Sequence, residues 1–305
     1  MLDNDDPVEI HDRRFQCLTA PNARLAQLHT GCGWAEGPVW FAEHGLLIWS
    51  DVPGQRLMRY IEGIGAGVLR ERTDFINGNT RDREGRLVSC EHGGRRVIRT
   101  EPDGRLTVLA DRHDGRRLNS PNDVVVKSDG SVWFTDPDYG ILSDYEGYRA
   151  EREQTGCHVY RIDPVTGGVL KVADGFSRPN GIAFSPDEAT LYVSDTGRSH
   201  DPDGPHHIVA FNVDEDGQLS GRRVVHVIAD GVSDGFRIDS LGNIWTSSRG
   251  GVICLTSSGD PIGRIRVPEI VSNVAFGGPR RTRLYITATR SLYAIDVGVT
   301  GAGRP

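Results

Sequence analysis

The 305-residue sequence predicts an all-β protein, a six-bladed β-propeller with four-stranded antiparallel blades, on three observations. A segment that reads as apolar run, turn and apolar run occurs six times, starting at Glu36, Asn79, Asn122, Asn180, Asp234 and Asn273. These starts lie 43, 43, 58, 54 and 39 residues apart, which brackets the roughly 40 to 50 residues of one propeller blade, with two longer copies. The 38 Gly and 16 Pro, about 18% of the chain against a usual total near 12%, indicate many turns.

Each copy predicts a β-hairpin followed by a second pair of strands. The apolar runs are short and β-branched, and no segment keeps helical apolar spacing for more than a couple of turns. The second pairs are seen at 157–163 with 169–174 and at 206–213 with 222–228. We therefore expect one domain over 1–305, with the repeats at 34–296 and the segment 1–33 completing or covering the last blade.

Propeller topology brings the starts of the six copies to one face, around the central axis. The loops that follow the second strands surround them, at 50–54, 90–94, 135–140, 194–198 and 247–251. The segment 135–156 lengthens the third copy. It is a candidate lid, and a long surface excursion is the alternative.

All six starts carry a carboxylate or a carboxamide, and none is basic or apolar. Asn and Asp often form turns, which could explain one such residue at the start of a copy. Turn formation explains less well why all six copies start with a residue of this kind. Around a narrow axis, carboxylates without a cation repel each other, and amide oxygens lack donors. Oxygen ligands without His or Cys suit calcium or magnesium. We expect one divalent cation, calcium first, with magnesium, manganese and zinc as alternatives.

The composition narrows the classes of partner. With 35 basic and 42 acidic residues, the net charge of −7 argues against nucleic-acid binding. No stretch approaches the roughly 20 apolar residues of a membrane helix, and the N-terminus has no apolar core like that of a signal peptide. Five Cys without a CxxC pair argue against a disulfide framework or a thiolate zinc site. We expect a soluble protein that binds no nucleic acid or membrane; its cytoplasmic or periplasmic location and its oligomeric state stay open.

Several segments resemble one family of six-bladed propellers: AEGPVW, LNSPNDVVVKSDGSVWFTDPDYG, RPNGIAFSPDEATLYVSD, SDGFRIDSLGNIW and NVAFGG. They are similar to the gluconolactonase, senescence marker protein (regucalcin) and luciferin-regenerating-enzyme family over nearly all of 34–296. The segments CEHGGRRVIR and RRLNSPNDVVVKSDG resemble its bacterial gluconolactonase branch most closely.

The resemblance implies a metal site and a reaction. It implies that Glu36, Asn180 and Asp234 hold a divalent ion, and that Asn122 ligates the ion or contacts substrate. Regucalcin-like members have an Arg two residues before that Asn, where this chain has Ser120, so their sugar-binding pattern does not transfer. The reaction implied is hydrolysis of an aldonolactone, such as gluconolactone, to its aldonic acid.

The chemistry needs little machinery, because a cyclic ester is activated and a Lewis acid stabilises the charge that develops on its carbonyl oxygen. Either Asp234 takes the proton of the attacking water, or the ion lowers the pKa of its own bound water; Asn122 would orient the lactone. Candidates for contacts with substrate hydroxyls are Glu91, His92, Asp136, Asp138, Tyr139 and Arg249. The alternative for each is a purely structural role in its loop.

Two other functions use the same features. The first alternative is an organophosphorus-ester hydrolase, because the similar diisopropyl-fluorophosphatase propellers hydrolyse such esters at a metal site of this kind. The second is a calcium-binding or scaffold propeller that catalyses no reaction. Ser233 stands in a GxSxG pattern typical of serine hydrolases. In those enzymes a helix follows the serine, whereas here a strand is predicted. We therefore expect Ser233 to have no catalytic role.

Overall fold

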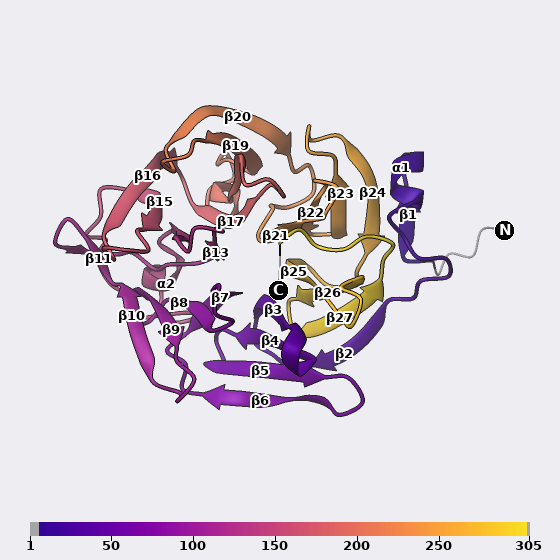
Figure 1. Cartoon of the computed structure of the whole chain (residues 1–305), viewed down its shortest axis with the longest axis horizontal. Helices are drawn as coiled ribbons and strands as arrows, with labels where there is room; N and C mark the ends of the chain where they lie inside the picture. Colours follow the sequence, from indigo (N-terminus) through magenta and orange to yellow (C-terminus); the bar gives the residue numbers. More distant parts are fainter. Residues whose placement is uncertain (1–5, 304–305) are drawn as a thin grey trace.

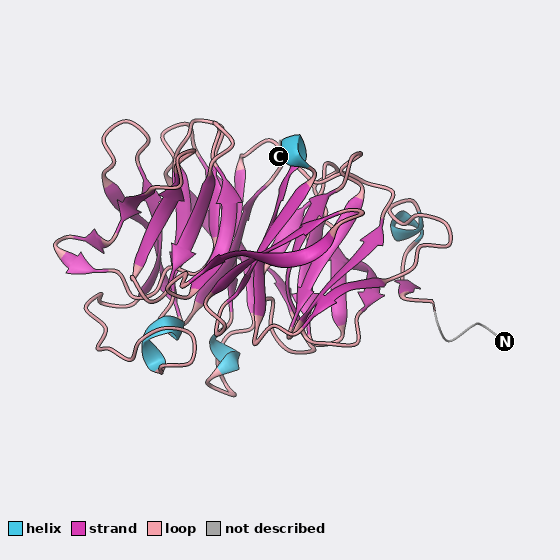
Figure 2. Ribbon diagram, turned by 90° about the horizontal axis from the view of Figure 1, so that it is seen from below, coloured by secondary structure: helices cyan, strands magenta, loops and turns pink. Residues whose placement is uncertain are grey.

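Six antiparallel sheets surround a central axis in the computed structural model, which describes residues 6–303 (Figure 1). Figure 2 shows the wheel edge-on, with its strands running between two faces that carry loops and short helices. The predicted six-bladed propeller is confirmed. No helix within residues 6–303 is long and apolar enough to cross a membrane.

The first three blades follow the chain from the inner strand outward. Blade 1 contains β3 (Ala35–Phe41), β4 (Leu46–Asp51), β5 (Arg56–Ile61) and β6 (Gly65–Glu71). Blade 2 contains β7 (Ile76–Arg81), β8 (Leu87–Glu91), β9 (Arg96–Thr100) and β10 (Leu106–Ala110). Blade 3 contains β13 (Val124–Val126), β14 (Val132–Asp136), β15 (Cys157–Ile162) and β16 (Val169–Phe176).

The last three blades keep this order, and the N-terminal part of the chain adds to two of them. Blade 4 contains β17 (Pro179–Phe184), β18 (Thr190–Asp195), β19 (His207–Val213) and β20 (Leu219–Val227). Blade 5 contains β21 (Phe236–Ile238), β22 (Ile244–Ser248), β23 (Gly251–Leu255) and β24 (Pro261–Arg266), with β1 (Val8–Ile10) added at its edge. Blade 6 contains β25 (Val271–Gly277), β26 (Arg283–Ala288) and β27 (Ser291–Asp296), and β2 (Ala26–Thr30) is its outermost strand. Because β2 pairs with β27, the two ends of the chain close the wheel.

Short elements decorate the wheel. They are α1 (Arg13–Gln16), η1 (Ala42–His44), the hairpin of β11 (Arg112–His113) and β12 (Arg116–Arg117), α2 (Tyr139–Leu142) and η2 (Gly197–Ser199). The last part of the described chain, in yellow, runs toward the axis in Figure 1.

Carboxylates close the hairpin turns at the far ends of the inner strands. Asp82 Oδ1 accepts hydrogen bonds from the backbone N–H groups two and four residues on, at 3.1 and 2.8 Å. Asp239 makes the same two contacts in blade 5, both at 2.9 Å. A carboxylate that satisfies two backbone donors makes a tight turn favourable, so the Asp and Gly residues of the repeat set the hairpins.

The core is divided among the blade-to-blade interfaces. Each of the six interfaces is one hydrophobic cluster, and Trp49, Trp133 and Trp245 are fully buried in three of them. All five Cys are free; four are buried, while Cys17 is exposed. Close packing between neighbouring blades leaves the inner strands little freedom, so their first residues have fixed positions around the axis.

Candidate functional site

Five polar residues gather where the inner strands begin. Glu36, Asn77 and Asn180 lie in β3, β7 and β17, whereas Asn122 and Asp234 lie two residues before β13 and β21. Their side chains are buried, apart from that of Asp234, which is partly exposed. We call Glu36, Asn77, Asn122, Asn180 and Asp234 the oxygen ring.

Backbone hydrogen bonds between blades connect neighbouring members of the oxygen ring. The Gly78 N–H donates to the Asn122 carbonyl oxygen at 2.8 Å, and the Gly181 N–H donates to that of Asp234 at 2.8 Å. A Cβ on Gly78 would lie 2.4 Å from the Asn122 oxygen, so a glycine has to follow the ring residue there. The blades therefore meet through the backbone of these residues, which leaves their side chains free for other contacts.

Asn77 is a ring residue that sequence reasoning missed. Asn79, the predicted start of blade 2, is fully buried and uses its carboxamide inside the fold. Its nitrogen donates to Gly37 O at 2.9 Å, and its oxygen accepts from the Ser89 hydroxyl at 2.7 Å. Asn77 Oδ1, in contrast, is buried without a hydrogen-bond partner among the described residues. The Asn77-Gly78 pair, which matches Glu36-Gly37, Asn180-Gly181 and Asp234-Gly235, is the signal that would have identified it.

Blade 6 departs from the pattern in a similar way. Ser272 takes the ring position, and its hydroxyl donates to the Ala35 carbonyl at 2.5 Å. Asn273, the predicted start, donates to Glu36 Oε2 at 3.4 Å and accepts from Val274 N–H at 2.9 Å. Asn273 therefore supports Glu36 and presents no free oxygen in phase with the others.

The two ring carboxylates crowd each other. Burial raises the pKa of Glu36 well above its ordinary value, and the charge of Asp234 raises it further. Burial also raises the pKa of Asp234 to about 7, with the Glu146 charge as the next cause, while contacts with Glu36 and Asn180 oppose the shift. Nearby, Asp123 is balanced by Arg237 at 3.3 Å. Neither Glu36 nor Asp234 has a basic partner within residues 6–303, although each is close to other carboxylates.

His92 holds two of the ring carboxamides. Its Nδ1 atom lies 3.0 Å from the Glu146 carbonyl oxygen, which can only accept, so the proton is on Nδ1. Burial lowers the pKa of His92 to about 4, so the ring is neutral and Nε2 is an acceptor. Nε2 lies 3.4 Å from Asn77 Nδ2 and 3.5 Å from Asn122 Nδ2. With their nitrogens turned to His92, both residues have their oxygens available, so His92 orients ring residues and makes no contact with solvent itself.

Tyr139 plays a comparable part beside Asn180. The Thr196 hydroxyl donates to the Arg178 carbonyl at 3.1 Å, so it accepts from Asn180 Nδ2 at 3.4 Å and from the Tyr139 hydroxyl at 2.7 Å. Tyr139 is buried, and its contact with Thr196 supports the orientation of Asn180. Tyr139 therefore contacts the oxygen ring through Thr196.

Asp136 and Glu91, predicted to contact substrate, lie within the fold. Asp136 accepts from the backbone N–H of Asn119 at 2.8 Å, as Asp195, at the same position of blade 4, does from Ser177 at 2.9 Å. Glu91 pairs with Arg96 at 2.7 Å. Both side chains are buried. Acids at the end of second strands therefore hold loops of the wheel, and their contact with substrate stays a prediction.

Asp138 and Arg249 are the last two residues that were predicted to contact substrate. Asp138 is buried and pairs with Arg178 at 2.8 Å. The Arg249 side chain is 70% exposed, with Asp230 3.9 Å away. Neither makes a hydrogen bond to the oxygen ring.

Ser233 stands next to Asp234, and its hydroxyl is bound inside the fold. Its hydroxyl is buried and forms a 2.6 Å hydrogen bond with the Thr246 hydroxyl. The residues that follow form the strand β21, as expected, and no helix.

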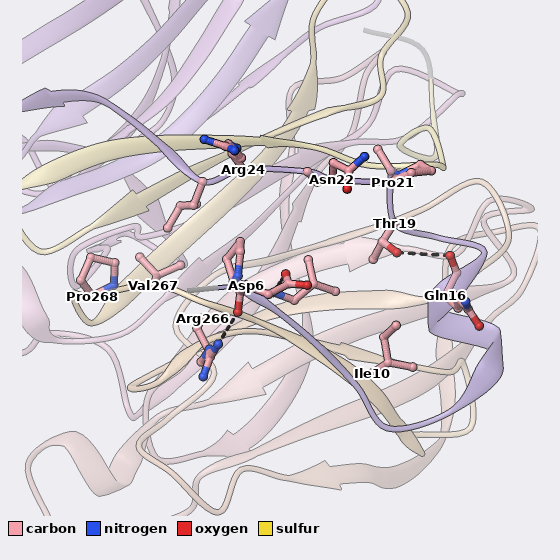
Figure 3. Close-up of a pocket in the computed structure, with 15 residues that line it drawn as sticks. Asp6, Ile10, Gln16, Thr19, Pro21, Asn22, Arg24, Arg266, Val267 and Pro268 are labelled. Atoms are coloured by element: carbon pink, nitrogen blue, oxygen red, sulfur yellow. Dashed lines mark hydrogen bonds between the residues drawn. The ribbon is translucent and has the colours of Figure 1, made fainter. Parts of the chain in front are cut away.

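Two cavities lie away from the oxygen ring. A groove of about 1160 Å³ lies between residues 6–25 and 266–268, beside β1, the edge strand of blade 5 (Figure 3). A cavity of about 620 Å³ occupies the far half of the channel, lined by the later residues of the inner strands and by 301–303. Neither cavity includes a ring residue.

The donor set of the oxygen ring fits a hard divalent cation. Within residues 6–303, no group of three or more His, Cys, Asp or Glu is arranged to hold a metal, so a cation site has to draw on carboxamides. The ring offers two carboxylates without basic partners and the orphaned oxygen of Asn77. Oxygen ligands of this kind suit calcium or magnesium and disfavour zinc.

Comparisons with known proteins agree with one another. The chain is 31% identical to a gluconolactonase of Zymomonas mobilis over 88% of this chain and 80% of that protein. It is also 31% identical to a pentonolactonase of Haloferax volcanii, over 89% and 94%. The solved structure of a gluconolactonase from Xanthomonas campestris superimposes with a TM-score of 0.90 at 39% identity, covering 96% of this chain and 95% of that one. The signature of the SMP-30/Gluconolactonase/LRE-like region matches residues 34–290, and the chain belongs to this family.

Proposed function

We propose that the protein hydrolyses sugar lactones to aldonic acids at a divalent-cation site formed by the oxygen ring. One observation carries the proposal: two carboxylates and three carboxamides converge around the axis, and neither carboxylate has a basic partner in the described part of the chain. Such a cluster is costly unless a positive charge is bound. Relatives named for gluconolactone and pentonolactone hydrolysis supply the substrate class.

Glu36, Asn180 and Asp234 would hold the cation, and the oxygens of Asn77 and Asn122 complete the ring. We propose calcium, because it accepts six to eight oxygens at relaxed geometry, so five protein oxygens leave positions for water and substrate. When bound, the cation would supply a Lewis acid for the lactone carbonyl.

The side chains of the oxygen ring would have different roles in hydrolysis. Of the two ring carboxylates, Asp234 is the one that is partly exposed, so we assign it to accept the proton of the attacking water. The water oxygen bonds to the carbonyl carbon, the ring C–O bond breaks, and the proton passes from Asp234 to the departing oxygen. Asn122, held by His92 through its nitrogen, orients the lactone. Glu36 is buried against Asn273 and serves to hold charge.

Acid release from a panel of five- and six-carbon sugar lactones tests this function. The protein is first chelated exhaustively, and calcium, magnesium, manganese and zinc are then added separately while a pH indicator follows hydrolysis. We expect no activity after chelation and recovery with calcium above all. Full activity of the chelated protein would refute the cation site, and failure to open any lactone with any cation would refute the function.

A further inference from the structure

The segment 137–156, between β14 and β15, brings Glu146 to the oxygen ring. It begins with α2 and folds back on itself, because the Ala150 N–H donates to Ile141 O at 3.1 Å. Gly147 packs against the backbone of Gly140 so closely that a Cβ would lie 1.9 Å from the Gly140 oxygen. The position of Glu146 is therefore set by the backbone on its C-terminal side.

His92 fixes the same residue from the ring side. Its Nδ1–H donates to the Glu146 carbonyl oxygen, while its Nε2 faces Asn77 and Asn122. One imidazole thus separates the backbone of Glu146 from two ring carboxamides. Tyr148, two residues on, packs edge-on against Phe75, with 5.3 Å between the ring centroids. These contacts hold the segment without using the side chain of Glu146.

The carboxylate of Glu146 makes no ion pair or hydrogen bond to any residue in 6–303. The other acids of the segment differ: Asp144 accepts from Arg149 N–H at 2.9 Å, and Glu153 accepts from Arg117 N–H at 2.8 Å. Glu151 also lacks such a contact, but it is exposed to solvent, whereas Glu146 is partly buried. The contact of its carbonyl oxygen with His92 places Glu146 beside the oxygen ring, and its charge contributes to the raised pKa of Asp234.

We propose that the Glu146 carboxylate accepts a hydrogen bond from a ring hydroxyl of the lactone and so makes the protein selective for polyhydroxylated lactones. The inference rests on the proposed function. A carboxylate held beside the ring without a donor of its own is a strong acceptor for a neutral hydroxyl. A site that hydrogen-bonds a substrate hydroxyl discriminates strongly against an analogue that lacks it.

Glu146→Gln tests the proposal, with Glu151→Gln as the matched control from the same segment. Both variants and the wild type are assayed with calcium on the sugar lactone that the wild type opens fastest and on δ-valerolactone, which has no ring hydroxyls. We expect Glu146→Gln to lower kcat/KM for the sugar lactone by about tenfold to a hundredfold, mainly through KM, because a charge-assisted hydrogen bond is lost. Turnover of δ-valerolactone should stay within about twofold of the wild type, as should both reactions of Glu151→Gln.

Three results would overturn the proposal. Equal losses of kcat on both lactones would make Glu146 part of the general machinery, and unchanged values on both would remove it from the site. A wild type that opens neither lactone would refute the proposed function and this inference with it. If Glu146→Gln lowers the melting temperature, Glu146→Asp, which keeps the charge but withdraws it by one methylene, takes its place and should show the same selective loss.

Discussion

Nε2 of His92 lies 3.4 Å from the carboxamide nitrogen of Asn77, and this contact turns the oxygen of Asn77 away from the imidazole. The arrangement requires a neutral imidazole with its proton on Nδ1, as the contact with Glu146 O imposes. A neutral histidine thus sets the orientation of the donor atoms in the proposed cation site.

Replacing His92 with Ala removes the common acceptor of Asn77 and Asn122. We expect calcium affinity to fall about tenfold to a hundredfold, the usual effect of losing a partner behind a metal ligand. His92→Gln, which keeps an acceptor oxygen, should recover part of that affinity. Isothermal titration with calcium measures both variants; equal affinity in His92→Ala and the wild type would contradict the positioning role.

Replacing Asn77 should affect calcium binding and hydrolysis, whereas replacing Asn79 should affect the stability of the fold. Asn77→Ala removes an unpaired buried oxygen, so we expect weaker calcium binding and slower lactone hydrolysis with little change in melting temperature. Asn79→Ala leaves buried partners such as Ser89 without a contact and should destabilise the fold by about 1–3 kcal/mol. Calorimetric titration and thermal unfolding of both variants check the split. The reverse pattern would show that the ring has been assigned to the wrong asparagine.

Glu36→Gln removes one of the two ring charges while preserving shape. Cation binding should weaken and lactone hydrolysis should be lost, because the remaining charge of the ring no longer balances a divalent ion. The circular dichroism spectrum should not change. Glu62→Gln, at an exposed ion pair with Arg283, is the control and should retain full activity. Wild-type calcium affinity in Glu36→Gln would remove Glu36 from the ligand set.

The stabilisation that calcium provides should depend on pH. In the cation-free protein the pKa of Asp234 is raised from its ordinary value near 4 to about 7, so the folded state holds more protons, and this contribution to stability is lost as pH rises from about 4 to about 7. Bound calcium needs the ionised carboxylates. The gain in melting temperature on adding calcium should therefore be small at pH 5 and large at pH 8.

The same scans with chelator present provide the reference. His92, with a pKa lowered to about 4, contributes to stability with the opposite pH dependence, which the difference between calcium and chelator largely removes. Asp234→Asn should abolish most of the pH dependence of the calcium effect. A gain that stays constant from pH 5 to pH 8 would argue against carboxylate ligation.

Repetition made the fold predictable. A propeller blade is built from local hairpins, so Asp82 and Asp239 close equivalent turns through contacts only two and four residues away. Six repeat starts spaced 39 to 58 residues apart, each followed by strand-like runs, therefore predict six blades. The repeat placed Glu36, Asn122, Asn180 and Asp234 among six candidate positions, and the family resemblance singled out these four.

In the sequence, only the glycine after Asn77 distinguishes it from Asn79, since both asparagines stand near the start of one strand. Packing against blade 1 decides which of the two carboxamides makes hydrogen bonds inside the fold. The role of His92 also depends on packing, because its partner Glu146 lies 54 residues further along the chain. Glu146 lies in a loop outside the repeat, and its place beside the ring follows from how residues 137–156 pack. The sequence by itself determined the architecture and most of the donor chemistry, since these follow from local pattern. Tertiary packing alone decided which polar groups remain unpartnered.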